Sequence, residues 1–216
     1  MTHNKAVVIV LLGPPGSGKG ETAKMLQDLG FAVIETGKAL RTLGEIDREI
    51  GESLDRGELQ PDSVVIPAER QRLQELSSIE RQRIVFDGFP RTSDQAAALL
   101  NEFVAEDAVI CVLDLHASLE VVTERLLIRG RTDDTPTGIE KRHRAYMANH
   151  DSIVEYFKLV PTRAHVLTVN AESSKDVVHA TILAHLNQLT QLNELRQTIE
   201  TGLSSIEQQA TASSTS

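Results

Sequence analysis

Gly13-Pro-Pro-Gly-Ser-Gly-Lys-Gly20 follows an apolar run at residues 6–12 and precedes a segment with helical spacing at residues 21–29. A strand, a glycine-rich turn and a helix in this order are typical of a phosphate-binding loop. Glycines let the backbone wrap closely around an anion, and the N–H groups that begin the next helix point at it. Lys19 adds a positive charge for the outer phosphates. We therefore expect this loop to bind a nucleotide; the alternative is a strand-to-helix turn that happens to be rich in glycine.

Length and charge narrow the class of protein. The 216 residues suit one α/β domain with small inserts. A net charge of −9 argues against a general nucleic-acid or anionic-membrane surface. The first apolar run is short and leads directly into the loop, so it is interpreted as a strand, and no run is long enough to span a membrane. Cys111 is the single cysteine, which favours a buried thiol and a reducing, cytoplasmic location.

The rest of the chain alternates between apolar runs and helical patterns. Further strands are expected at residues 31–34, 83–87, 108–114 and 164–169. Such alternation predicts an α/β fold with a parallel sheet covered on both faces. Ligands of these sheets bind beyond the carboxyl ends of the strands, so the loop and the segments that follow each strand should meet at one edge.

Local signals predict the helices between these strands. Ile46, Ile50 and Leu54 recur every four residues, which favours one helical face. A long helix should begin after Pro61, and Thr92 is a candidate cap for the next one. Residues 130–138 are polar and charged and are expected to form a loop before a helix at 139–159.

Four motifs occur in a fixed order: residues 13–20; Thr-Gly-x-x-Leu-Arg at 36–41; Asp-Gly-Phe-Pro-Arg-Thr at 87–92 with Gln95; and Arg-Thr-Asp-Asp at 131–134 with Arg142. Together they resemble the adenylate kinase family of nucleoside monophosphate kinases, over about residues 5–185. The resemblance implies a P-loop nucleoside triphosphate hydrolase-like domain at residues 1–186 with a five-stranded parallel sheet. It also implies a small insert for the monophosphate at about 36–65 and a very short lid at about 129–138.

The resemblance further implies an activity and a site. The γ-phosphoryl group of Mg·ATP would pass to AMP and give two ADP. The ATP site would comprise Gly16, Ser17, Gly18, Lys19, Gly20, Glu21, Arg125 and Arg129. The AMP site would comprise Thr36, Arg41, Glu58, Leu59, Gln60, Gly88, Phe89, Pro90, Arg91, Gln95, Arg131 and Arg142. The catalytic set would be Lys19, Arg91, Arg129, Arg131 and Arg142.

The same resemblance implies one metal ion. Asp87 would hold Mg²⁺ through water, while Asp133 and Asp134 would hold the lid arginines or support the closed state. The lid has no set of cysteines, so no zinc is expected, and the seven histidines show no metal-ligand spacing.

The chemistry is consistent with these residue types. Phosphoryl transfer needs two phosphates held in line, water excluded and spreading negative charge neutralised. Arginine suits this task because its planar guanidinium binds phosphate oxygens in pairs. No general base is required, since the phosphate of AMP is already an anion.

Departures from the family pattern limit the resemblance. Glu21 and Lys38 stand where the family has Thr and Asp. A carboxylate beside a triphosphate is repulsive, so Glu21 is expected to lower affinity for Mg·ATP or turnover relative to threonine. Only Gly130 separates Arg129 from Arg131, and the insert is trimmed.

Two other functions remain open. A kinase for UMP or CMP is one, although Thr36 and Gln95 favour an adenine edge. A nucleotide-binding regulator with weakened catalysis is the other. Residues 187–209 are expected to continue an amphipathic helix, and 210–216 to be disordered. This helix would pack on its own domain in a monomer, or join two copies through a coiled-coil seam.

Overall fold

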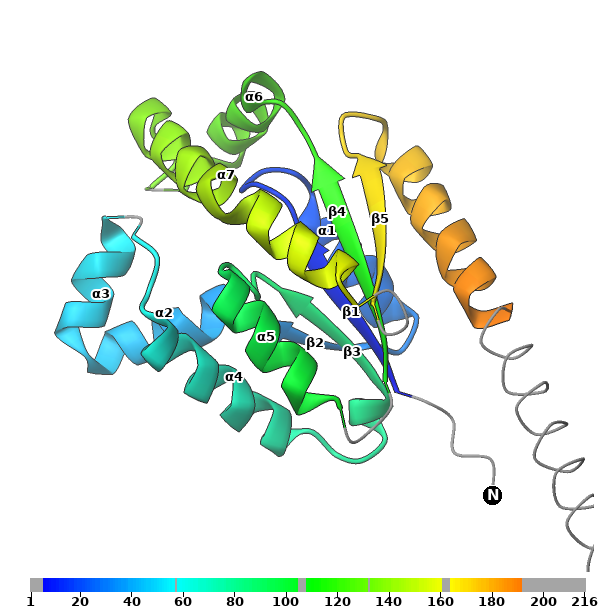
Figure 1. Ribbon diagram of the computed structural model, residues 1–216. Coiled ribbons are helices and arrows are strands. Elements are labelled where there is room, and N and C mark those ends of the chain that lie inside the picture. The colour runs from blue at the N-terminus through cyan, green and yellow to red at the C-terminus, as the bar shows by residue number, and fades with distance from the viewer. Residues whose placement is uncertain (1–5, 57, 105–107, 132, 161–163, 192–216) are drawn as a thin grey trace, which may run out of the picture. The chain divides into compact units, whose positions relative to one another are not determined.

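The computed structural model describes residues 6–56, 58–104, 108–131, 133–160 and 164–191. Five strands form one parallel sheet in the order β2-β3-β1-β4-β5 (Figure 1). The strands are β1 (Val7–Leu12), β2 (Ala32–Glu35), β3 (Arg83–Asp87), β4 (Val109–His116) and β5 (Ala164–Asn170). The expected α/β class, parallel sheet and number of strands are confirmed.

The register of β1 with its neighbours positions the carboxyl edge of the sheet. Leu11 lies opposite Asp87 of β3, and Leu12 lies opposite Asp114 of β4. The phosphate-loop motif follows β1 directly, so two carboxylates from different strands end beside it. Every residue of β1 from Val8 to Leu12 is buried, as expected for a central strand covered on both faces.

Helices cover both faces of the sheet. They are α1 (Lys19–Asp28), α2 (Thr36–Ile46), α3 (Arg48–Asp55), α4 (Asp62–Glu75), α5 (Ser93–Glu102), α6 (Leu119–Arg129) and α7 (Pro136–Lys158), with a short 3₁₀ turn at Glu80–Gln82. In Figure 1, α5 and α7 lie in front of the strands and α1 lies behind them. Val8 and Val10 belong to one buried cluster with Leu99 of α5 and Phe157 of α7.

Helix α2 ends earlier than the repeat of isoleucine and leucine predicts. Ile46 is the last residue of α2 and is 85% exposed, while Ile50 and Leu54 belong to α3. Asp47 separates the two helices because its carboxylate accepts hydrogen bonds from the backbone N–H groups of Glu49 and Ile50. The expected single face through Ile46 is therefore wrong, and a capping residue is the reason.

The loop before α7 is shorter than expected. Thr135 caps this helix by accepting from the N–H of Gly138, and Pro136 occupies its first turn. Proline is favoured there because it has no N–H to leave unbonded. Only residues 130–135 therefore connect α6 to α7, and Arg129 at the end of α6 pairs with Asp134, just before α7 begins. Strand β4 in turn extends two residues further than predicted, to His116.

The chain divides into two compact units, Met1–Lys175 and Asp176–Ser216. In the second unit, residues 176–191 are helical. The predictions for 192–209 and for the tail at 210–216 lie outside the described residues. Within the described part of the chain, no helix combines the length and the apolar character that crossing a membrane requires.

Candidate active site

The phosphate-loop motif joins β1 to α1 in a turn that only glycine can form. Gly16 has a φ of +88°, and a Cβ there would lie 3.0 Å from the carbonyl oxygen of Val122 in α6. The Nζ of Lys19 donates to the main-chain oxygens of Gly13 and Pro14, at 2.7 and 2.9 Å. The ammonium is thus held over the loop whose backbone is expected to bind phosphates.

Three other charged residues act on Lys19. Its pKa is lowered to about 8, mainly by burial; the carboxylate of Asp87 opposes this, and the positive charges of Arg91 and Arg129 add to it. The end of β3 and the end of α6 are therefore electrostatically coupled to the loop. Lys19, Arg91 and Arg129 together carry more positive charge than Asp87 neutralises, so the binding of an anion would stabilise this site.

The segment after β3 turns back through Gly88 and a cis bond between Phe89 and Pro90. Gly88 has a φ of +94°, and a Cβ there would lie 3.1 Å from Nη2 of Arg91. Nε of Arg91 donates to the carbonyl oxygen of Gly88, 2.8 Å away. Desolvation lowers the pKa of Arg91. The carboxylates of Asp87 and Glu69 oppose this shift, and the nearby positive charge of Arg41 adds to it.

Gln95 is buried and its amide is bonded on both sides. Its Oε1 accepts from the backbone N–H of Arg91 at 2.7 Å, and its Nε2 donates to Oδ1 of Asp62 at 2.7 Å. Asp62 also accepts from the hydroxyl of Thr92, which caps α5 as predicted. Gln95 thus fixes the main chain of Arg91 and links α4 to α5, two features that sequence reasoning missed.

The remaining residues proposed for AMP come from the insert formed by α2, α3 and the start of α4. Arg41 is exposed, and its Nη1 lies 3.3 Å from the position that a Cβ on Gly37 would occupy. Gln60 is buried and donates from Nε2 to Oγ of Ser53. Glu58 and Leu59, by contrast, are exposed.

Helix α7 reaches the same insert. Nζ of Lys141 donates to the carbonyl oxygen of Arg56 at 2.8 Å and lies 3.9 Å from the carboxylate of Glu58. Because α7 begins at the short lid, this contact links the lid segment to the insert within the first unit of the chain.

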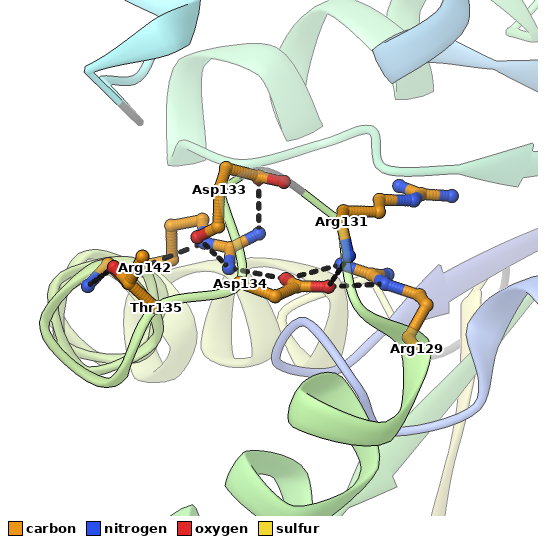
Figure 2. A network of polar contacts seen from close by, with 7 residues as sticks. Arg129, Arg131, Asp133, Asp134, Thr135 and Arg142 are labelled. Atoms are coloured by element: carbon orange, nitrogen blue, oxygen red, sulfur yellow. Dashed lines mark hydrogen bonds and ion pairs between the residues drawn. The ribbon is translucent and has the colours of Figure 1, made fainter.

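Asp134 is the centre of the lid (Figure 2). Its carboxylate accepts from Nε and Nη2 of Arg129 at 2.9 and 2.8 Å, and from Nη2 of Arg142 at 2.8 Å. It also accepts from the backbone N–H of Arg131. Asp133 pairs with Nη1 of Arg142 at 2.7 Å. The expected aspartate–arginine contacts of the lid are present in the structure.

The burial of Asp134 makes these contacts strong. Burial alone would raise the pKa of its carboxyl, but the hydrogen bonds from Arg129, Arg142 and the N–H of Arg131 outweigh it and hold that pKa well below its usual range. In Figure 2, the guanidinium of Arg131 points away from both aspartates. Two lid arginines are therefore fixed by one carboxylate, and the third extends away from them.

Two residues of the proposed ATP site lie at its margin. The carboxylate of Glu21 is exposed and forms an ion pair with the ammonium of Lys175. Arg125 lies on α6 and acts on the carboxyl of Glu172, whose pKa is lowered mainly by hydrogen bonds from Ser118. Neither residue contributes to the charges that shift the pKa of Lys19.

Asp87 has the chemistry that a hydrated Mg²⁺ ion requires. Its carboxylate ends β3 beside the loop, where burial raises its pKa, the charge of Lys19 opposes the rise, and Glu35 adds to it. A cation stabilises a partly buried carboxylate that is repelled by the negative charge of a second one. Oxygen ligands of this kind suit Mg²⁺, which usually keeps several of its waters.

Glu69 is a buried acidic group that sequence reasoning missed. It lies between Val65 and Leu73 on the inner face of α4 and is 2% exposed. Within the described residues, neither of its carboxylate oxygens has a hydrogen bond of ordinary geometry, and the nearby hydroxyl of Thr36 is equally buried and unbonded. The sequence did contain a signal, because Glu69 stands four residues after Val65 and four before Leu73, on the apolar face of the helix.

Replacing Glu69 with glutamine should stabilise the protein at alkaline pH. Burial raises the pKa of Glu69 to about 7, and the Thr36 hydroxyl opposes this only in part. The native state thus keeps a proton that the unfolded chain releases near pH 4.5, so stability is present at low pH and lost as the pH rises towards 7. Between pH 5 and 8 the parent should lose on the order of 2–3 kcal/mol of unfolding free energy relative to Glu69→Gln.

Urea unfolding at several pH values measures this difference. Glu75→Gln, an exposed change on the same helix, is the control and should show no such trend. Equal pH dependence of the parent and Glu69→Gln would contradict the prediction.

The structure also gathers histidines that the spacing along the chain did not connect. Asp114 and His116 end β4, and His150 of α7 lies against both. The ligand atoms of these three side chains all lie within 4.8 Å of one another, a proximity that spacing along the chain does not reveal.

Comparison with known proteins agrees with this fold and this arrangement of charges. The family model described as adenylate kinase matches residues 11–161. The chain is 34% identical to an adenylate kinase of Corynebacterium urealyticum over 82% of its length and 97% of the relative's. It is 31% identical to an adenylate kinase of Deinococcus radiodurans, over 87% and 100%, and 33% identical to one of Thermus thermophilus, over 82% and 96%.

Nucleoside monophosphate kinases are the class that this fold and site define. Within that class, the chain belongs to the adenylate kinase family and is an enzyme of that family.

Proposed function

We propose that this enzyme transfers the γ-phosphoryl group of Mg·ATP to AMP and releases two ADP. The observation that carries the proposal is the joint action of Arg91 and Arg129 on Lys19. These cations come from the segment after β3, the end of α6 and the start of α1. A phosphoryl group that is being transferred between two nucleotides carries negative charge, and these three cations would neutralise it.

The loop is proposed to hold ATP. The N–H groups of Gly16, Gly18 and Gly20 would bind the β- and γ-phosphates, because the start of α1 favours an anion. The hydroxyl of Ser17 supports this, since it is buried and has no hydrogen-bond partner among the described residues. Lys19 would exchange its two carbonyl contacts for phosphate oxygens.

The insert and the segment after β3 are proposed to hold AMP. Arg41 and Arg91 lie close enough for their charges to repel each other, so a phosphate between them would relieve the repulsion. The backbone of Glu58, Leu59 and Gln60 would flank the base. Gly88, Phe89 and Pro90 would form the opposite wall, with Thr36 and Gln95 beneath the adenine.

The short lid is proposed to complete the site. Arg129, Arg131 and Arg142 would surround the transferring group, and Arg125 would lie on the adenine of ATP. The shared carboxylate of Asp134 supports this, because it fixes two of these guanidiniums before any substrate binds. Fixed donors lose little entropy in the transition state.

Asp87 is proposed to hold Mg²⁺ through water. When bound, the ion would supply positive charge that offsets the negative charge of the phosphates. Asp87 would orient the waters of that ion, and Lys19 would share the charge of the carboxylate.

An assay with a panel of acceptors tests the function. ADP formation is measured with Mg·ATP and AMP, CMP, UMP or GMP, each supplied alone. We expect turnover with AMP to exceed that with any other monophosphate by at least a factor of ten. Preference for CMP or UMP would assign the acceptor differently. Thermal stabilisation by ATP without ADP formation from any acceptor would favour a regulator and overturn the proposal.

Replacing Glu21 with threonine should raise kcat/KM for Mg·ATP only a few-fold. Glu21 lies in the first turn of α1, beside the proposed phosphate site, but its carboxylate is exposed and paired with Lys175. Exposed charge pairs are worth about 1 kcal/mol or less, which limits the gain to about five-fold. The gain should shrink as salt is added. Steady-state kinetics at two ionic strengths measures it, and an unchanged kcat/KM at low salt would contradict the prediction.

A further inference from the structure

We propose that Asp114, His116 and His150 form a binding site for one divalent transition-metal cation, with Zn²⁺ as the representative ion. The three side chains each offer one ligand atom, and these atoms all lie within 4.8 Å of one another. Two imidazoles and one carboxylate are the donors that Zn²⁺ and similar ions prefer. The site differs from that proposed for hydrated Mg²⁺, which involves Asp87 and nucleotide phosphates.

The distances leave room for an ion after a small adjustment. Nε2 of His116 lies 2.6 Å from Oδ2 of Asp114, and Nε2 of His150 lies 3.0 Å from the same oxygen. Ligand atoms around a tetrahedral zinc ion are roughly 3.3 Å apart, because each lies about 2.0–2.1 Å from the metal. His116 is 50% exposed at its side chain, so its imidazole has room to move away from Asp114 and towards His150, whose ligand atom lies within 4.8 Å.

The orientation of His150 is that of a metal ligand. Its Nδ1 lies 2.8 Å from Oδ1 of Asp151. In the tautomer with its proton on Nδ1, the ring donates to Asp151 and presents the lone pair of Nε2 to the carboxylate of Asp114. A cation between Nε2 and that carboxylate would take the place of the proton that otherwise bonds the two atoms. Metal-binding histidines commonly donate their second N–H to a carboxylate in this way.

The surroundings favour an open coordination position. Asp114 and His150 are buried, whereas His116 is open to solvent. Three protein ligands beside solvent leave the fourth position for water. The hydroxyl of Tyr146 also lies 3.5 Å from Oδ1 of Asp114, which helps to fix the carboxylate.

A cation bound here would join β4 to α7. The helix α7 carries Arg142 near its start, and β4 ends at the same edge of the sheet as the phosphate loop. Binding would therefore stabilise the scaffold that holds the lid arginine, by an amount that grows with the metal concentration.

Zinc titration of the nucleotide-free protein, prepared without a polyhistidine tag, tests the site. A competing chromophoric chelator at about pH 8 reports stoichiometry and affinity. The parent should bind one Zn²⁺ per chain, and zinc should raise its Tm. His116→Ala and His150→Gln should each weaken binding by about 100-fold or more, and Asp151→Asn by about ten-fold. His143→Ala, a change on the same helix outside the cluster, should bind as the parent does.

Spectroscopy separates lost binding from lost folding. Co²⁺ in place of zinc should give visible absorption bands in the parent and in His143→Ala, and His116→Ala should lack them while keeping the circular dichroism of the parent. A parent that binds no zinc at micromolar concentrations would overturn the proposal. Parent-like affinity in His116→Ala would overturn it as well. Since none of these measurements involves turnover, the result is independent of the proposed kinase activity.

Discussion

Replacing Arg91 with alanine should lower kcat with ATP and AMP by about 10³-fold or more. This expectation follows from the position of the guanidinium, which acts on Lys19 and is itself influenced by Asp87 and Arg41. A preorganised donor aimed at developing charge contributes several kcal/mol to the transition state, and about 1.4 kcal/mol corresponds to ten-fold in rate. The loss should appear in kcat and in kcat/KM for AMP.

The control for Arg91 is an arginine of the same domain that takes no part in the proposed site. Arg144 is 76% exposed at its side chain and pairs with Glu140 along α7, so Arg144→Ala should keep kcat within two-fold, as expected of an exposed pair. Rates measured by ADP release, with circular dichroism to verify folding, compare the two. Activity of Arg91→Ala within ten-fold of the parent would mean that Arg91 does not contact the transferring group.

Replacing Asp134 with asparagine should lower both activity and stability. The change keeps the shape but removes the charge that holds Arg129 and Arg142. We expect kcat to fall about 100-fold, because misplaced guanidiniums stabilise the transition state less. The free energy of unfolding should fall by about 2 kcal/mol, as hydrogen bonds to charged groups contribute roughly 1.5–3 kcal/mol.

The stability difference should depend on pH in a defined direction. The pKa of Asp134 is held below its usual range in the folded protein. Its contribution is therefore present above the pKa of the unfolded chain, near 3.9, and is lost as the pH falls below that value. Unfolding curves should show the full difference at pH 7 and a smaller one near pH 3.

Asp133 provides the matched control for Asp134. It is the neighbouring aspartate, but it is 45% exposed and pairs only with Arg142 in the described contacts. Asp133→Asn should therefore cost less than about 1 kcal/mol and leave most of the activity. Equal effects of the two substitutions would show that Asp134 is not the centre of the network.

Patterns along the chain were sufficient for the class of fold and for the family. The strand–loop–helix order around residues 13–20 predicted the phosphate loop, and the apolar runs predicted a parallel sheet. The cap at Thr92 was also foreseen, because capping depends on neighbouring residues. The roles of the site residues stay predictions, since they concern bound substrates.

Hydrophobic periodicity and helix capping compete as local signals, and this competition explains why some predicted helix bounds were wrong. The repeat of Ile46, Ile50 and Leu54 favoured one helix, but the side chain of Asp47 bonds to backbone N–H groups and begins a new one. In the same way, Thr135 and Pro136 begin α7 earlier than the apolar pattern indicates. Capping interactions outweigh periodicity at helix ends, because unbonded N–H groups are costly.

The sequence by itself determined the class of fold, the family and the strand–turn–helix order around residues 13–20, because these depend on short patterns whose physics is local. Only the tertiary structure decided which side chains share a partner. It brought Glu69 beneath Thr36, made Asp134 rather than Asp133 the anchor of two arginines, and placed His150 against Asp114. These contacts join residues that lie up to 36 positions apart, and their energies depend on burial and on distance, neither of which spacing along a chain reveals.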